Sequence, residues 1–337
     1  MEPGVAVRRG YPGGDGSGDS GVSGEENMNS AIVTGANGFI GCALLKELTV
    51  HGASVTAVVK DEKEDTTEIK DLPGVQIVYC EMDELAKLPG KITEQADVFY
   101  HLAWAGSTGL ARRDYDIQLR NVHWTLDAVN ATKVIGCSRF VGIGTLAEVD
   151  VNAYTPLEGS TPNAVSCYGA AKIAAHYMSK AECNRLGIDH VWTRLTNVYG
   201  IGNYTSNFVN FAAKLMLTGQ PANFTSGEQM YDFACIEDIA QGIYCAGEHG
   251  KKNVSYYIGS TKPAKLKEFI QIIRDTIDPS ISLNLGAVPF NGVSHPKSVF
   301  DCSRLVEDTG YQPRVPFEAG IKKTIPWLRK QIEVGKI

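Results

Sequence analysis

The sequence predicts an α/β fold in which a doubly wound parallel sheet carries a smaller C-terminal α/β lobe. From Met28 onward, short apolar runs alternate with helical stretches, the pattern expected of βαβ units. A glycine-rich turn joins the first apolar run to the first helical stretch. After about residue 200 the alternation becomes less regular, which indicates the second lobe. A chain of 337 residues, 43% of them hydrophobic, is long enough to fill both cores.

Six apolar runs are the expected strands of the sheet, in the order 31–33, 54–59, 76–79, 98–101, 140–143 and 190–194. The helices expected between them include residues 43–48, 115–132 and 168–186, and those of the second lobe are 208–217, 236–248 and 265–275. In open parallel sheets, ligands bind at the carboxyl ends of the strands, where the strand order reverses. Side chains that follow strand ends are therefore expected to meet in one crevice.

The turn after the first strand reads T-G-A-N-G-F-I-G at residues 34–41. Gly35 permits a tight turn, Gly38 lets the backbone approach a pyrophosphate, and Gly41 lets the helix pack closely on the strand. The free N–H groups and the positive dipole end of the helix would face the phosphates. Strand, glycine loop and helix in this order predict a Rossmann-like dinucleotide site, and the alternative is an ordinary strand-to-helix turn.

A tyrosine and a lysine lie four positions apart at Tyr168 and Lys172. On a helix these positions share a face, so the phenol and the ammonium lie side by side. A free tyrosine titrates at about pH 10, and an adjacent cation favours the phenolate. Lys172 is therefore expected to lower the pKa of Tyr168, which makes Tyr168 a candidate proton donor or acceptor near neutral pH. The alternative is an exposed helical pair.

Together these motifs resemble those of extended short-chain dehydrogenases/reductases, in the branch called the NAD-dependent epimerase/dehydratase family. Further landmarks of that family recur in order between about residues 29 and 330. They include D-V-F-Y-H-L-A at 97–103, R-L-T-N-V-Y-G at 194–200 and Q-M-Y-D-F at 229–233. The resemblance implies a dinucleotide-binding domain formed mainly by residues 28–200, interleaved with a substrate-binding lobe formed mainly by residues 201–337.

The resemblance implies three catalytic residues, which are Thr145, Tyr168 and Lys172. Thr145 matches the active-site Ser or Thr and would hydrogen-bond a substrate oxygen, although its hydroxyl could instead be satisfied by a nearby carbonyl. Tyr168 would be the general acid or base, and Lys172 would also bond the nicotinamide ribose. The expected cofactor contacts are Gly35, Gly38, Phe39, Ile40, Gly41, Lys60, Glu81, Met82, Leu102, Ala103, Tyr168, Lys172, Leu195 and Val198.

The chain departs from the 4,6-dehydratases of this family after the active-site threonine. Those enzymes place an Asp and a Glu there, where this chain has Leu146 and Ala147. Eliminating water from a hexose needs a base and an acid, which neither side chain supplies, so dehydration is disfavoured. Glu148 lies one position too far along, and in an extended chain it would point to the opposite face. It is expected to be a solvated or capping carboxylate.

Five residues are expected to contact the substrate: Trp104, Thr145, Asn197, Tyr231 and His295. Many family members meet the nucleotide diphosphate with an arginine where this chain has Tyr231, which cannot neutralise a phosphate. Either His295 or Lys297 supplies the charge, or the substrate is not a standard nucleotide diphosphosugar; the alternative for both is a surface loop. Asn197 matches a position that contacts substrate phosphates, with a loop amide as its alternative. Trp104 either walls the site beside the nicotinamide or is a core aromatic.

The second expected strand ends at Val59 and is followed by Lys60, Asp61 and Glu62. An acidic residue at such a strand end bonds the ribose hydroxyls and selects NAD, whereas a cation accommodates the 2′-phosphate of NADP. Asp61 lies at about the distance from the glycine motif at which the acidic residue is expected. The alternation of side chains along the strand, however, makes Lys60 the first side chain after Val59 that can reach the ribose. The sequence therefore favours NADP, with NAD as the alternative, and Lys60 could also be a solvated charge.

The expected activity is hydride transfer between a nicotinamide cofactor and a carbonyl or hydroxyl of a nucleotide-activated sugar, with ketoreduction favoured. One alternative is an epimerase that retains NAD, and another is a nucleotide-binding regulator that has lost catalysis. Family members commonly dimerise through the helices expected at 115–132 and 168–186, so a homodimer is expected. Its candidate contacts are Leu126, Val129, Ile173, Ala174 and Met178, which could instead face their own sheet.

The composition of the chain bears on which kinds of partner it can bind. The net charge of −6, without a basic stripe, disfavours nucleic acid, and no apolar run approaches a membrane span. Eight scattered cysteines without paired Cys/His spacing indicate reduced thiols of a cytoplasmic protein and no metal site. Residues 1–27 contain eight glycines and two prolines and are expected to be a disordered tail or a vector remnant.

Overall fold

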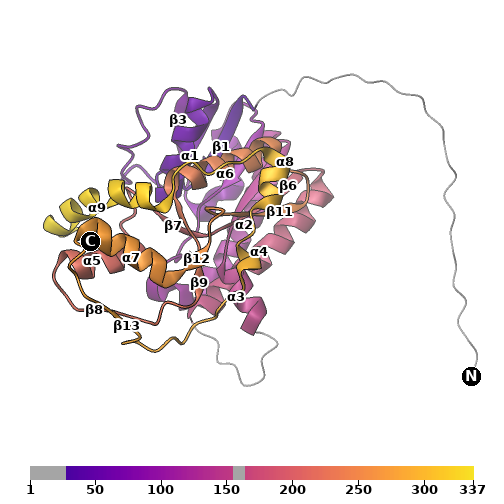
Figure 1. Ribbon diagram of the computed structural model, residues 1–337. Helices are drawn as coiled ribbons and strands as arrows, with labels where there is room; N and C mark the ends of the chain where they lie inside the picture. Colours follow the sequence, from indigo (N-terminus) through magenta and orange to yellow (C-terminus); the bar gives the residue numbers. More distant parts are fainter. Residues whose placement is uncertain (1–27, 155–163) are drawn as a thin grey trace, which may run out of the picture.

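The computed structural model describes residues 28–154 and 164–337, and its centre is a seven-stranded sheet (Figure 1). The strands in chain order are β1 (Ser30–Thr34), β2 (Ser54–Val59), β3 (Val75–Tyr79), β4 (Val98–His101), β5 (Arg139–Thr145), β6 (Asp189–Leu195) and β11 (Val254–Ile258). Across the sheet they run β11-β6-β5-β4-β1-β2-β3, and all neighbours pair in parallel. The strand order reverses between β1 and β4, which confirms the doubly wound α/β fold and marks the ligand-binding edge.

The six strands expected from apolar runs are all present, each within two residues of its expected bounds. The seventh strand, β11, was not expected because it follows residue 200, where the alternation of apolar runs weakens. Val254 to Ile258 pair in register with Val191 to Leu195, so β11 extends the main sheet beyond β6. The division of the chain at residue 200 stays a prediction.

Helices cover both faces of the sheet. Successive side chains of each strand point to opposite faces and therefore pack into two different cores. Ala31 and Val33 of β1 face α1 (Phe39–Val50) and α6 (Ile236–His249), in a core that includes Leu44 and Ile243. Ile32 points the other way, into a core with α2 (Tyr115–Ile135) and α4 (Ala164–Leu186). This two-sided burial explains why the strands read as continuous apolar runs.

The second lobe has its own core, to one side of the sheet in Figure 1. Three helices supply most of it: α5 (Phe208–Leu217), α7 (Leu266–Ile277) and α9 (Phe317–Glu333). Phe233 lies at its centre, with its ring 5.0 Å from Phe269 and 5.6 Å from Phe317. The short strands are β7 (Asn197–Tyr199), β8 (Ala222–Phe224), β9 (Met230–Tyr231), β10 (Phe233–Cys235), β12 (Ala264–Lys265) and β13 (Leu283–Leu285). The pairing of β7 with β10 joins this lobe to the end of β6.

The remaining elements pack mainly against the helices that cover the sheet. They are α3 (Ala147–Tyr154), α8 (Ser303–Thr309) and the 3-10 helices η1 (Met82–Lys91), η2 (Gly109–Arg113) and η3 (Lys297–Phe300). All eight cysteines are free thiols, six of them buried. No helix within residues 28–154 or 164–337 is long and apolar enough to cross a membrane. The expected tail at residues 1–27 lies outside the described residues.

Candidate active site

The glycine loop folds as tightly as its sequence predicts. Gly35 has φ +68°, and a Cβ there would lie 2.9 Å from the backbone nitrogen of Ala103, beyond the end of β4. A Cβ on Gly41 would lie 2.2 Å from the carbonyl oxygen of Gly35. α1 begins at Phe39, and the Gly38 N-cap has no side chain to bond its first N–H groups. These groups therefore remain available to an anion such as a pyrophosphate.

The other expected cofactor contacts follow strand ends along the same edge. Leu102 and Ala103 follow β4, Leu195 ends β6, and Val198 lies in β7. Lys60 follows β2, beside Glu81 and Met82 beyond β3, because the nitrogen of Cys80 donates to the oxygen of Val59. A hydrogen bond of 2.9 Å between Thr34 Oγ1 and His101 Nδ1 ties β1 to β4 where the strand order reverses. The fold thus brings the expected contacts to one edge of the sheet.

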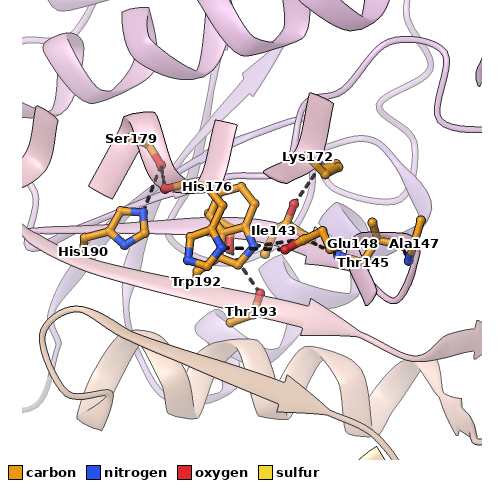
Figure 2. Close-up of polar contacts among 11 residues, drawn as sticks. Ile143, Thr145, Ala147, Glu148, Lys172, His176, Ser179, His190, Trp192 and Thr193 are labelled. Atoms are coloured by element: carbon orange, nitrogen blue, oxygen red, sulfur yellow. Dashed lines mark hydrogen bonds and ion pairs between the residues drawn. The ribbon is translucent and has the colours of Figure 1, made fainter. Parts of the chain in front are cut away.

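The three candidate catalytic residues come from two elements that meet beside this edge. Thr145 ends β5, and Tyr168 and Lys172 lie on α4, with both of the latter buried. Lys172 Nζ donates to the carbonyl oxygen of Ile143, at 2.7 Å, as Figure 2 shows. Tyr168 forms a side-chain hydrogen bond with Thr145. The arrangement can therefore hold an oxygen atom against two hydroxyl groups, one of which can transfer a proton.

The electrostatics of Tyr168 differ from the sequence expectation. Burial raises the pKa of Tyr168, while the Arg112 guanidinium and the hydrogen bond with Thr145 lower it. The Arg112 guanidinium carbon lies 4.8 Å from the centre of the phenol ring, and Lys172 Nζ lies 6.0 Å from it. The expected lowering by Lys172 is not found in this structure: burial is the largest effect and raises the pKa of Tyr168, and the cation that offsets it is Arg112 of η2.

Lys172 lies in an environment that disfavours its charge. Burial lowers its pKa to about 7, and the carboxylate of Glu148 raises it in part. Its Nζ lies 3.5 Å from the centre of the Trp104 ring, a cation–π contact. Trp104 also packs edge-on against Tyr168, with ring centres 6.0 Å apart, and donates from Nε1 to Gln118. Trp104 therefore lies beside both candidate catalytic residues of α4, and it also packs against the buried cluster that includes Ala171 and Trp192, so its role in the site stays a prediction.

We expect Arg112→Gln to shift the pH profile of the reaction. In the direction that oxidises an alcohol, Tyr168 must accept a proton, so kcat/KM rises with pH through the pKa of this group. Removing the cation destabilises the phenolate, so this rise should move to higher pH. The measurement is kcat/KM against pH for wild type and variant. Arg112→Lys keeps the charge and should stay closer to wild type; equal profiles for all three proteins would contradict the assignment.

A pocket of about 210 Å³ lies between the sheet edge and the second lobe. Asn197, Tyr231 and His295 line it, so the fold brings together three of the five expected substrate contacts. Its walls are completed by Leu146, Asp150, Met230, Phe290, Gly292, Val293 and Phe300. Lys297 is exposed on η3, so His295 is the candidate cation that lines this pocket.

His295 is engaged by a carboxylate that the sequence did not indicate. Its Nε2 lies 2.5 Å from Asp150 Oδ1, which comes from α3. Burial and the charge of Asp150 raise the pKa of Tyr231 on the same wall. The charge of a protonated His295 would therefore be offset by Asp150. The arginine that many family members have at the position of Tyr231 is, by contrast, a permanent cation.

The family model of the NAD dependent epimerase/dehydratase family matches residues 31–259. The chain belongs to this family. Mouse dTDP-D-glucose 4,6-dehydratase is 25% identical over 325 residues, covering 90% of each chain. The Bordetella bronchiseptica enzyme WbmF in complex with NADH has a TM-score of 0.75 at 22% identity, covering 91% of this chain and 94% of its own. UDP-glucose 4-epimerase of Thermotoga maritima with UDP-glucose also has a TM-score of 0.75, at 19% identity and coverages of 90% and 99%.

Three polar residues of this family member were missed or misjudged from the sequence. Arg112 and Asp150 were not considered, because nothing in their local sequence links them to Tyr168 or His295. Glu148 was expected to be solvated or capping, but it is buried and lies in a helix rather than an extended segment. The carboxylate of Glu148 accepts a hydrogen bond from the backbone nitrogen of Thr145, three positions earlier, so the capping alternative agrees with the structure and the solvated one is wrong.

Proposed function

We propose that this protein is an NAD(P)-dependent oxidoreductase that reduces a carbonyl of a nucleotide-activated sugar. The observation that carries this proposal is the meeting of Thr145, Tyr168 and Lys172 beside the sheet edge that bears the glycine loop. The pocket with Asn197, Tyr231 and His295 would take the substrate. UDP-sugars bound to structurally similar proteins support a nucleotide sugar as the ligand class.

In this proposal each residue acts on a stated atom. A nicotinamide cofactor, when bound at the glycine loop, would supply the hydride for the carbonyl carbon. Thr145 donates a hydrogen bond to the carbonyl oxygen, and Tyr168 gives that oxygen its phenolic proton as negative charge develops there. Lys172 would hold the ribose of a bound cofactor, and Trp104 would keep water from the reacting atoms. Turnover then requires that the phenolate of Tyr168, which the nearby charge of Arg112 stabilises, regain a proton.

Dehydration remains disfavoured in this proposal, although 4,6-dehydratases are among the relatives. Leu146 lines the pocket and Ala147 is buried, so neither position offers an acid or a base. Glu148 accepts hydrogen bonds from Thr145 and Trp192, on the side of β5 that faces α4. It is therefore engaged away from the pocket.

An epimerase that retains NAD is the second candidate, because the similar WbmF structures hold NAD+ or NADH. Reductase and epimerase differ in whether the cofactor leaves after each turnover. Mass spectrometry of the cofactor that copurifies separates them: an empty or NADP-loaded site supports reduction, and tightly held NAD supports epimerisation. A regulator without catalysis is the third candidate; the complete set of Thr145, Tyr168 and Lys172 argues against it.

We propose NADP as the preferred cofactor, through Lys60. This side chain is 61% exposed at the end of β2, and Asp61 Oδ2 lies 3.9 Å from its Nζ. It is therefore free to reach a 2′-phosphate, at a cost set by the neighbouring carboxylate. Titration of both reduced cofactors should show tighter binding of NADPH to wild type. Lys60→Ala should weaken NADPH severalfold and leave NADH almost unchanged; a wild-type preference for NADH would reverse the proposal and favour the epimerase.

We also propose a homodimer through α2 and α4. These helices expose Tyr115 and Leu119 on one, and Tyr177 and Met178 on the other, each at least 48% exposed. Of the contacts expected from the sequence, Val129 is fully buried against its own sheet, so the expectation that it contacts a partner subunit is wrong. Leu126, Ile173 and Ala174 are half-buried.

Light scattering should show a dimer at micromolar concentration. Leu119→Arg together with Met178→Arg should shift it to a monomer, because two charges would be buried in an apolar interface. Val50→Arg, at an exposed valine on α1, is the matched control and should remain dimeric. A wild-type monomer would contradict the proposal.

We propose that the protein resides in a reducing compartment, the cytoplasm, because of the state of its cysteine thiols. All eight cysteines are free, and burial raises the pKa of Cys137, Cys183 and Cys302 to about 12. Such thiols are poor nucleophiles and need no disulfide partner to be stable.

A further inference from the structure

A buried carboxylate lies directly behind the candidate catalytic threonine. Glu148 is the second residue of α3, and it is 3% exposed. Its Oε1 accepts a hydrogen bond of 2.9 Å from the backbone nitrogen of Thr145 and one of 3.1 Å from Trp192 Nε1 (Figure 2). The Thr145 hydroxyl in turn accepts from the nitrogen of Ala147, at 3.3 Å. The end of β5 is thereby fastened from both its backbone and its side chain.

The backbone is shaped to admit this carboxylate. A Cβ on Gly144 would lie 2.3 Å from Glu148 Oε1 and 2.3 Å from Trp192 Nε1. A Cβ on Gly142 would lie 2.3 Å from the Trp192 ring. The two glycines of β5 therefore leave the space that the indole and the carboxylate occupy, and any side chain at either position would displace them.

The same carboxylate reaches the helix that carries Tyr168 and Lys172. His176 lies one turn beyond Lys172 on α4, and its Nδ1 is 3.7 Å from Glu148 Oε2. The His176 ring stacks on Trp192, with centres 4.7 Å apart and planes within 2°. Deeper in the layer, Ser179 of α4 hydrogen-bonds His190 of β6 at 2.9 Å. Glu148 thus joins α3, the end of β5, β6 and α4 in one buried polar assembly.

We propose that Glu148 is a positioning residue that fixes Thr145 relative to Tyr168 and Lys172, a role that rests on the proposed hydride-transfer function. Without an acceptor, the Thr145 N–H would be left beside the Trp192 ring, and the end of β5 would lose the link to His176 of α4 that this carboxylate provides. A displacement of the Thr145 hydroxyl by about 1 Å is enough to cost about 100-fold in rate. The charge of Glu148 also raises the pKa of both Tyr168 and Lys172, so the carboxylate is close enough to interact electrostatically with both groups.

The test compares Glu148→Leu with Glu148→Gln in the full chain. Leucine removes the acceptor while keeping the volume close, so kcat should fall about 100-fold, with the dissociation constant of NADPH changed less than about twofold. Glutamine keeps an oxygen that can accept from Thr145, so it should restore kcat to within about fivefold of wild type. Trp192→Phe removes the indole donor, together with part of the ring that fills the space beside Gly142 and Gly144, and provides a second variant if Glu148→Leu does not fold; it should give a smaller loss of kcat.

A readout that needs no turnover separates this proposal from the proposed function. Amide hydrogen exchange of Thr145 should be slow in wild type and Glu148→Gln, and markedly faster in Glu148→Leu. Wild-type kcat and exchange in Glu148→Leu would overturn the positioning role, as would equal losses of kcat and of cofactor binding, which indicate general damage. If wild type transfers no hydride to any sugar ketone while exchange responds as expected, the proposed function fails and the fastening of Thr145 by Glu148 stands.

Discussion

Replacing Tyr168 by phenylalanine is expected to lower kcat by about 10²- to 10⁴-fold with cofactor affinity little changed. The substitution removes the phenolic oxygen that would transfer the proton and keeps the ring that packs edge-on against Trp104. The hydrogen bond with Thr145 is lost at the same time, so the loss includes any positioning that it provides. The measurement is single-turnover hydride transfer, followed by absorbance of the reduced nicotinamide, together with fluorescence titration of the cofactor.

Tyr177→Phe is the matched control for this loss. Tyr177 lies on the same helix but is 65% exposed, so removing its hydroxyl should leave kcat within about twofold of wild type. Near wild-type turnover by Tyr168→Phe on the true substrate would refute the assignment of proton transfer to this residue. In that case Lys172, whose pKa burial lowers to about 7, becomes the group to examine.

Gly41→Ala is expected to damage both stability and cofactor binding. The new Cβ would lie 2.2 Å from the oxygen of Gly35 and 2.7 Å from that of Ala36, and both are backbone atoms that cannot rotate away. Separating α1 from the loop should cost about 1–3 kcal/mol of unfolding free energy, as overpacking does in other cores. Because the same shift moves the N–H groups at the start of α1, the affinity for the dinucleotide should fall at least about tenfold.

Gly90→Ala provides the comparison, since a Cβ at Gly90 meets nothing within 4 Å. It should unfold at a temperature close to that of wild type and bind the cofactor equally well. The two variants are compared by thermal denaturation with and without NADPH, which should stabilise wild type and Gly90→Ala more than Gly41→Ala. Equal stabilisation of all three proteins by the dinucleotide would mean that it does not bind over the glycine loop.

The pocket chemistry bears on which nucleotide sugar this family member would accept. The Asp150 carboxylate lies 2.5 Å from His295 Nε2, and Tyr231 stands where many family members present an arginine to a diphosphate. Binding of a diphosphate would therefore depend on neutral donors more than on permanent cations, which predicts a weaker salt dependence than that of arginine-bearing relatives.

Local sequence determined the framework of this protein. The apolar runs identified six strands of the sheet because both faces of a parallel sheet are buried, which leaves a continuous signal along each strand. The glycine motif predicted the turn into α1 because Gly38 and Gly41 are required by backbone atoms of Gly35 and Ala36 in the same loop. The spacing of Tyr168 and Lys172 placed both on one helix for the same reason, since a helical face repeats every three to four residues.

Only the tertiary structure decided how these groups are charged and held. Arg112, rather than Lys172, lies closest to the Tyr168 ring because η2 folds over α4, and Asp150 reaches His295 across the two lobes. Glu148 was placed behind Thr145 by the space that Gly144 leaves beside Trp192. A pKa and a buried hydrogen bond depend on the atoms that close around a group from every direction. Those atoms come from distant segments, so no local pattern encodes them.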